Sequence, residues 1–169
     1  ELDACVAATP DKLALTAVQV ESGAVRHFTY RELAGLADRI AVGLARLGVG
    51  KNDVVALQLP NWWQFTLTYL ACSRIGAVIN PLMHIFRERE LSFMLKHGEA
   101  KVLLSDPEYS GVIKAALGRA ERKPLVVDVP DPVFDVPGER LGELIYDELL
   151  AEGDPAFEPC YPADEWQAI

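Results

Sequence analysis

The sequence predicts an α/β fold with a mostly parallel sheet and helices on both of its faces. Between residues 54 and 127, short apolar runs alternate with longer segments of helical periodicity, and the connections are short. Strands that alternate with helices form parallel sheets, because each helix returns the chain across a face of the sheet. Runs that are apolar throughout are typical of strands covered on both faces. The sheet is expected to be incomplete at its C-terminal end.

The N-terminal part is expected to form a hairpin and then a helix. Two β-prone runs lie on either side of a short gap that contains Gly23, which predicts a hairpin over 13–28. Thr29 and Glu32 have the spacing of a capping box, in which each side chain satisfies a backbone N–H at the helix start. Apolar residues then recur at helical spacing and predict a helix over 30–47.

The central part carries the sheet. Asn61 and Asp106 each follow an apolar run and precede a helical pattern, so both are expected to cap helices. Pro107 follows Asp106 at the first helical position, where its missing N–H costs nothing. The expected strands are 54–59, 77–80, 101–104 and 125–127, and the expected helices are 62–75, 87–97 and one that starts at Pro107.

The C-terminal part differs in composition. Residues 128–169 hold 12 acidic side chains and one basic one, whereas residues 1–127 hold 13 acidic and 15 basic ones. Prolines are concentrated there, one helix is expected over 141–151, and the acidic stretch is interpreted as a solvated, loosely structured surface. We therefore divide the chain into a hairpin and capping-box helix (1–53), a parallel β-α-β unit (54–129) and an acidic, proline-rich extension (130–169).

Composition excludes several classes of protein. The formal net charge of −9, without a basic stripe, argues against a nucleic-acid binder. The three cysteines, Cys5, Cys72 and Cys160, lack the spacing of disulfides or of a zinc site, which favours a reducing, cytoplasmic location. The most apolar stretch, 62–75, is too short and too polar to cross a bilayer, and no secretory signal peptide is expected.

Parallel sheets bind ligands beyond the carboxyl ends of their strands. The longest loop at that edge is expected at 81–86 and carries His84, with Arg87 at the start of the next helix. Helix starts in this position point backbone N–H groups at anions. The alternative is that these are ordinary loops, since every parallel sheet has them.

Motif searches give no catalytic set. Gly48-Val49-Gly50-Lys51 follows a helix rather than a strand, so it is a helix terminator and not a phosphate loop. The histidines have no cysteine or carboxylate at ligand spacing, so no metal site is expected. Cys72 is expected to pack in the core. Trp62 and Trp63 are adjacent on a helix, so at most one faces the core squarely, and the other is a candidate ligand platform or interface residue.

Several stretches, in order, resemble the adenylate-forming superfamily of acyl-CoA synthetases, peptide-synthetase adenylation domains and luciferases. One departure is Asn52, where that family usually has glycine. The run 80–104 is most similar to medium-chain and alicyclic carboxylate–CoA ligases such as the cyclohexanecarboxylate group. The matching stretches are Phe28-Thr29-Tyr30-Arg31-Glu32-Leu33, residues 47–56, Leu59-Pro60-Asn61, residues 76–82 and Glu90-Leu91.

The resemblance implies a parent enzyme that joins a carboxylic acid to coenzyme A through an acyl-adenylate, using ATP and Mg²⁺. Residues 163–169 resemble the lead-in to the family's phosphate loop, so the chain is expected to be an N-terminal fragment that is inactive alone and binds no cofactor tightly. No catalytic residue carries over, and Arg87 is the candidate on the coenzyme A side. Exposed strand edges would favour self-association, for example as a homodimer. The alternatives are a peptide-synthetase adenylation domain and a free-standing Rossmann-like binding module.

Overall fold

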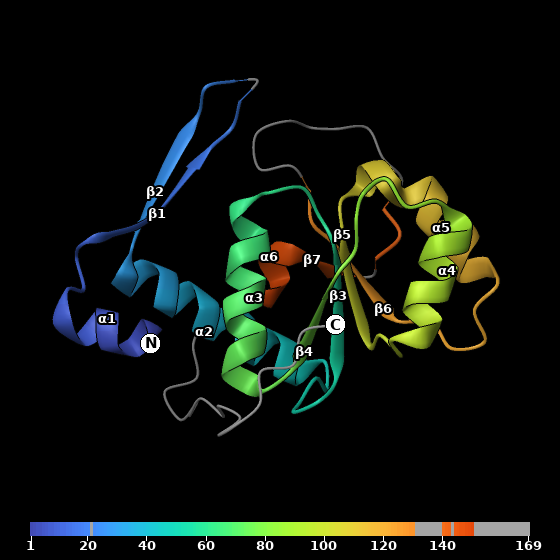
Figure 1. The fold of residues 1–169 in the computed structure, drawn as a ribbon, viewed down its shortest axis with the longest axis horizontal. Helices are drawn as coiled ribbons and strands as arrows, with labels where there is room; N and C mark the ends of the chain where they lie inside the picture. Colours follow the sequence, from blue (N-terminus) through green and yellow to red (C-terminus); the bar gives the residue numbers. More distant parts are fainter. Residues whose placement is uncertain (21, 131–139, 143, 151–169) are drawn as a thin grey trace.

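A five-stranded parallel sheet forms the centre of the structure, in the order β4-β3-β5-β6-β7 (Figure 1). The structure is a computed structural model, and it describes residues 1–20, 22–130, 140–142 and 144–150. The parallel sheet confirms the expected fold class. Its strands are β3 (Val54–Gln58), β4 (Val78–Pro81), β5 (Val102–Ser105), β6 (Leu125–Asp128) and β7 (Leu144–Ile145).

Helices cover both faces of this sheet. On one face lie α2 (Tyr30–Arg46), α3 (Trp63–Ile75) and α6 (Tyr146–Leu149), and on the other lie α4 (Glu88–His97) and α5 (Ser110–Gly118) (Figure 1). The side chains of β3 alternate between the two layers. Val55 and Leu57 belong to the core cluster under α2 and α3, whereas Val54 and Ala56 belong to the cluster under α4. An apolar run without alternation is therefore explained by burial on both sides.

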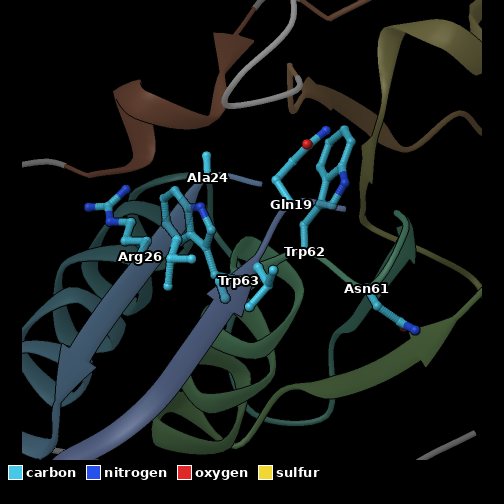
Figure 2. Close-up of a pocket in the computed structure, with 9 residues that line it drawn as sticks. Gln19, Ala24, Arg26, Asn61, Trp62 and Trp63 are labelled. Atoms are coloured by element: carbon cyan, nitrogen blue, oxygen red, sulfur yellow. The ribbon is translucent and has the colours of Figure 1, made fainter. Parts of the chain in front are cut away.

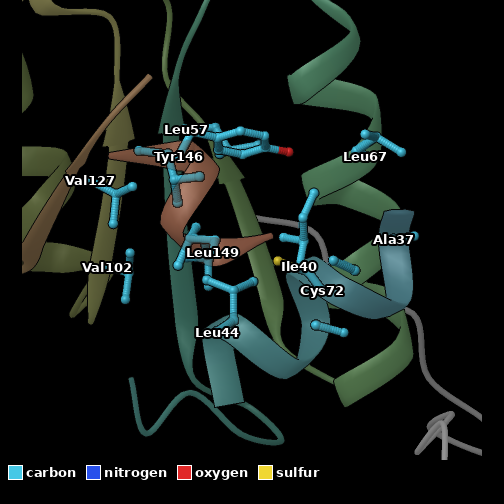
Figure 3. Packing of buried hydrophobic residues seen from close by; sticks show 14 of the residues in the cluster. Ala37, Ile40, Leu44, Leu57, Leu67, Cys72, Val102, Val127, Tyr146 and Leu149 are labelled. Carbon is cyan, nitrogen blue, oxygen red and sulfur yellow. The ribbon is translucent and has the colours of Figure 1, made fainter. Parts of the chain in front are cut away.

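The larger core cluster joins three helices to the sheet. Ile40 and Leu44 of α2 meet Leu57 of β3 and Leu149 of α6, and Tyr146 lies beside them (Figure 3). Each of these side chains is almost completely buried. Burying a leucine or isoleucine side chain stabilises the fold by roughly 1.5–3 kcal/mol, so this cluster is a main source of stability.

The start of α2 forms the expected capping box. Glu32 N donates to Thr29 Oγ1 over 3.3 Å, and Thr29 N donates to Glu32 Oε2 over 2.8 Å. The hydrogen bond from the Thr29 backbone is the main reason that the pKa of Glu32 lies below its usual value. The helix is followed by Gly48 with a φ of 81°, which confirms that the glycine-containing stretch terminates a helix. Asn52 has a φ of 67°, a conformation that asparagine tolerates better than most residues.

The N-terminal region contains the expected hairpin and one helix that the sequence analysis did not find. Strands β1 (Leu13–Val18) and β2 (Val25–Thr29) pair antiparallel as a separate two-stranded sheet. The unexpected helix, α1 (Leu2–Ala8), has no buried residue, so its sequence carries only a weak apolar pattern. An ion pair holds it, because Arg74 of α3 contacts Asp3 at 2.8 Å and Asp38 of α2 at 2.9 Å.

The sequence analysis predicted a helix over 141–151, and this prediction is wrong in length. Leu144 and Ile145 form a short strand that pairs with Val127 and Asp128 of β6, and only Tyr146–Leu149 is helical. The free edge of β6 gives these two residues backbone partners that a longer helix would forgo. Residue 151 lies outside the described residues, as does the stretch 163–169.

Helix α6 lies directly against α2 at Gly43. A Cβ atom added at Gly43 would lie 2.9 Å from Leu149 Cα and closer still to the Leu149 carbonyl oxygen. Arg39 of α2 also donates to the Leu150 carbonyl oxygen over 2.7 Å. The end of the described chain is thus fixed to a helix near its beginning.

One expected helix cap differs and another is confirmed. Asn61 does not cap α3, because Trp62 N bonds to the Pro60 carbonyl at 2.7 Å and this turn shifts the helix start by one residue. Asp106 does cap the turn that follows β5, since its Oδ1 accepts from Glu108 N over 2.9 Å. That first turn, η1 (Pro107–Tyr109), is a 3₁₀ turn that leads into α5.

Candidate ligand site at the carboxyl edge of the sheet

The parallel register brings the carboxyl ends of neighbouring strands together. Asp106 N donates to the Gln58 carbonyl over 3.4 Å, and Val129 N donates to the Ser105 carbonyl over 2.8 Å. The expected convergence of the strand ends is therefore confirmed for β3, β5 and β6. The loop 81–87 adjoins them, because β4 pairs with β3.

Strands β3 and β5 diverge beyond their carboxyl ends. The chain leaves β3 towards α3 on one face of the sheet, and it leaves β5 towards η1 and α5 on the other face (Figure 1). In open parallel sheets, such a switch point opens a crevice in which ligands bind. The strand ends at Gln58 and Asp106 therefore mark the candidate site.

Two loops meet across this edge through their aromatic rings. His84, in the loop after β4, stacks on Tyr109 of η1, with ring centroids 6.3 Å apart and an interplanar angle of 25°. Burial raises the pKa of the Tyr109 hydroxyl, and the nearby Glu108 and Asp106 carboxylates add to this shift. Tyr109 is therefore a neutral donor at physiological pH. The stack fixes the two loops relative to each other.

The end of β3 carries a buried amide with unused hydrogen-bonding capacity. Gln58 is 0% exposed, and its Nε2 donates to the Met83 carbonyl over 3.4 Å. Its Oε1 has no hydrogen-bond partner among the residues that the structure describes. An unpaired buried carbonyl costs free energy, so it marks a place where a donor from a ligand or water would be stabilising.

Arg87 lies where the sequence analysis placed it, at the start of α4. Its backbone N donates to Glu90 Oε2 over 3.1 Å, and its side chain is exposed. Two apolar side chains of the same loop are also unusually exposed, Met83 at 55% and Ile85 at 61%. The loop thus presents a cation and apolar surface next to the stack formed by His84 and Tyr109.

The end of β6 is less open. Asp128 is buried, its Oδ2 accepts from Gly142 N over 3.0 Å, and Arg140 Nε lies 3.8 Å from the same oxygen. The chain's own return towards β7 therefore uses this carboxylate. Of the strand ends named by the sequence analysis, those of β3, β4 and β5 form the candidate site.

The other chemistry-bearing residues lie elsewhere. Cys72 is buried in the core, and burial raises the pKa of its thiol to about 12, so it is not a nucleophile. His27 bonds to Thr16 Oγ1 at 3.1 Å, and His97 stacks on Phe93 at the end of α4. Within the described ranges, no group of three or more histidine, cysteine or acidic side chains could hold a metal ion.

Sequence reasoning missed Gln58 and the pairing of His84 with Tyr109. Gln58 stands at the end of an apolar run, and a polar residue in a strand that is buried on both faces is a usable signal. The ring stack gives no such signal, because it depends on the distance between two loops that the sequence does not encode locally. Trp62 and Trp63 are both half-buried and both pack against the larger core cluster, so neither faces the core alone.

Comparison with known proteins decides the family. The family model described as AMP-binding enzyme matches residues 2–161. The chain belongs to the AMP-binding enzyme family. This confirms the resemblance to adenylate-forming enzymes, whereas no comparison tests the specificity for cyclohexanecarboxylate.

Relatives of the family that resemble the chain include fatty-acid–CoA ligases. The long-chain-fatty-acid–CoA ligase of Thermus thermophilus is 32% identical over 142 residues, which cover 83% of the chain and 25% of the relative. The medium-chain fatty-acid–CoA ligase of Escherichia coli is 38% identical over 98 residues, which cover 58% of the chain and 16% of the relative. The chain spans about a quarter or less of the length of these family members.

Solved structures show the same fold. An acyl-CoA synthetase of Brucella canis superposes with a TM-score of 0.72 at 24% identity over 89% of the chain and 26% of that structure. The luciferase-like enzyme of the mealworm Zophobas morio gives 0.80 at 19% identity over 99% of the chain and 37% of that structure. In the chain itself, no helix among the described residues is long and apolar enough to cross a membrane.

Proposed function

We propose that the chain is the N-terminal portion of an ATP-dependent carboxylate–CoA ligase. The family match over residues 2–161 carries this proposal, and the relatives named as fatty-acid–CoA ligases support it. In the proposed reaction, a carboxylate oxygen attacks the α-phosphorus of ATP and pyrophosphate leaves. The thiol of coenzyme A then attacks the acyl carbonyl, its proton is released and AMP leaves. We propose a medium-chain or alicyclic acid as substrate, in line with the medium-chain relative.

The described residues are proposed to supply the scaffold and one side of the coenzyme A site. Among these residues no group of three or more histidine, cysteine or acidic side chains could hold a metal ion, and we propose that the Mg²⁺ that would balance the phosphate charge is bound elsewhere in the enzyme. We therefore propose that residues 1–169 form no acyl-adenylate alone, and we propose a cytoplasmic enzyme because Cys5 and Cys72 are free thiols.

The experiment compares this chain with the complete product of its gene. We expect the complete product to release pyrophosphate with a carboxylate and ATP, and to form a thioester only when coenzyme A is added. The chain alone should release none. Pyrophosphate release by the chain alone would contradict the proposal that residues 1–169 form no acyl-adenylate by themselves. Transfer of the acyl group to a carrier protein instead of coenzyme A would identify a peptide-synthetase adenylation domain.

Arg87 is proposed to contact a phosphate group of coenzyme A. Its guanidinium is exposed beside the stacked loops, and arginine binds phosphate oxygens through two parallel hydrogen bonds. In the complete enzyme, Arg87→Gln should raise the KM for coenzyme A about tenfold, which corresponds to one charge-assisted hydrogen bond. The rate of pyrophosphate release should not change, because that step precedes coenzyme A binding.

Arg89→Gln is the matched control. Arg89 is also exposed and is the second residue of α4, and residues two positions apart on a helix do not face the same side. Equal KM values for the two variants, whether both raised or both normal, would exclude a specific role for Arg87. We also propose a homodimer, because β4 lies at the edge of the sheet, and sedimentation of the complete enzyme as a monomer would refute this.

A further inference from the structure

A pocket lies between the N-terminal hairpin and the start of α3. Val18, Val25 and Arg26 of the hairpin line it, together with Trp62 and Trp63. In Figure 2 the two indoles stand apart, with Gln19 and Ala24 of the hairpin near them and Arg26 beside Trp63. The pocket uses none of the residues of loop 81–87 or of η1, so it is distinct from the candidate coenzyme A site.

The walls of this pocket are apolar surface that remains in contact with water. Val18 is 58% exposed and Val25 is 53% exposed, although both belong to a β-hairpin, and the indole of Trp62 is only half-buried. Burying such surface is favourable in proportion to the apolar area removed from water. A flat apolar ring that packs against an indole would gain this free energy and a further aromatic contact.

Arg26 gives the pocket a positively charged group that is already ordered. Its guanidinium carbon lies 4.4 Å from the centroid of the Trp63 ring and 4.7 Å from that of Phe28. These two rings also contact each other, with centroids 5.6 Å apart. Because its flat face is occupied by the aromatic rings, the guanidinium has its N–H edge left for hydrogen bonding.

The charge of Arg26 has no ion-pair partner within the described part of the chain. The ion pairs among the described residues all involve other cations, for example Arg31, which pairs with Asp11 at 3.3 Å. The side chain is exposed, and its fixed position reduces the entropy lost when an anion binds. The charge of Arg26 also acts on the Glu32 carboxylate, although the two side chains make no ion pair. A cation in this position, next to apolar and aromatic walls, is complementary to a ligand with a flat apolar body and a single negative charge.

We propose that this pocket binds a small aromatic monocarboxylate. The ring packs against the indoles of Trp62 and Trp63, and the carboxylate accepts hydrogen bonds from Arg26. This inference does not rest on the proposed ligase activity, since it concerns binding at a separate site. No bond is made or broken in this step.

The test is a titration of the 169-residue chain with 2-naphthoate and, separately, with its neutral counterpart 2-naphthalenemethanol. Binding is measured by calorimetry and by the shifts of the indole N–H signals in NMR spectra. We expect saturable binding of 2-naphthoate with a Kd below about 1 mM, and about tenfold weaker binding of the alcohol. Absence of saturable 2-naphthoate binding, or equal affinity for both ligands, would overturn the proposal.

Variants separate the charge from the ring contact. Arg26→Gln should bring the affinity for 2-naphthoate down to that for the alcohol and leave the alcohol unchanged. Trp62→Ala should weaken both ligands several-fold, in line with the loss of an aromatic contact. If Arg26→Gln weakens both ligands equally, Arg26 only supports the pocket wall, and the proposed carboxylate contact is wrong.

Two controls complete the design. Arg31→Gln removes the same charge from an exposed arginine outside the pocket and should leave both affinities unchanged. ATP and coenzyme A should not displace 2-naphthoate. Displacement by either would mean that the ring binds in a nucleotide site such as the candidate coenzyme A site, which would overturn a separate pocket without affecting the proposed ligase function.

Discussion

The two ends of the parallel sheet differ in whether their polar side chains have partners. At the amino end, Asp53 accepts hydrogen bonds from Gly50 N and from Lys101 Nζ, both over 2.8 Å. Lys101 also donates to the carbonyl oxygen of Gly48. At the carboxyl end, Gln58 Oε1 lacks a partner in the described structure and the side chain of Arg87 is exposed.

This difference separates stability from binding. The amino end carries short turns, and the charged side chains of Asp53 and Lys101 pair there. The carboxyl end carries longer loops, and two of them meet through the stack of His84 on Tyr109. Substitutions at the amino end should therefore reduce the free energy of unfolding, whereas substitutions at the carboxyl end should change ligand affinity with little effect on folding.

The largest effect is expected from Asp53→Ala. The substitution removes the acceptor of two hydrogen bonds and leaves the Lys101 ammonium without its carboxylate. We expect a loss of about 1–2 kcal/mol in the free energy of unfolding, since both side chains are partly exposed. Urea denaturation measures this loss. Glu121→Ala, at an exposed acidic residue in a turn, should change stability little, and an equal loss in both variants would refute the special role of this pair.

The same pair should give the amino end a dependence on pH. The hydrogen bond from Lys101 is the main reason that the pKa of Asp53 lies below its usual value, and burial opposes this shift. A lowered pKa in the folded state means that the stabilisation is complete above the unfolded pKa of about 4 and is lost as the pH falls through the folded pKa. Asp53→Asn should therefore flatten the loss of stability below about pH 4.

Urea midpoints measured between neutral pH and about pH 3 test this expectation. Glu32 has a lowered pKa for a different reason, the hydrogen bond from the Thr29 backbone, and contributes with the same sign. The Asn variant should therefore keep part of the acid dependence. Identical pH profiles for the original protein and Asp53→Asn would show that the ion pair adds nothing to folding.

The smallest effect is expected at the carboxyl end. Gln58→Met replaces a buried amide, whose carbonyl lacks a partner in the described structure, by an apolar side chain of similar volume. We expect stability to be unchanged or to rise by up to about 1 kcal/mol, because the cost of the unpaired carbonyl disappears. Thermal unfolding measures it. A clear loss of stability would show that the carboxyl end is also built for folding, and the contrast between the two ends would fail.

The sequence predicted the parts of the fold that are encoded locally. Helix α2 was found from its capping box and its apolar spacing, and the buried strands from their uninterrupted apolar runs. Strand β7 was missed because two residues carry no periodicity, and they become a strand only by pairing with β6. Helix α1 was missed because it has no buried face and is held by Arg74, which lies 71 positions from Asp3.

For the candidate site, too, the sequence predicted only what is encoded locally. Strand ends in a parallel sheet must converge, so the loop 81–87 and the residue Asp106 could be placed at one edge from periodicity alone. The stack of His84 on Tyr109 and that of Arg26 on Trp63 could not, because each joins side chains from different elements. Such contacts depend on packing between elements, for which a single sequence gives no local signal.

The close contact between α6 and Gly43 has a consequence for the ribosome-bound chain. The hydrogen bond from Arg39 to the Leu150 carbonyl oxygen forms only after Leu150 has been synthesised, 111 positions later. At typical rates of translation this delay is on the order of ten seconds, far longer than a helix needs to form. During that interval the surface of α2 at Gly43 is not yet covered by α6, so the last packing step on this face of the sheet follows the pace of synthesis.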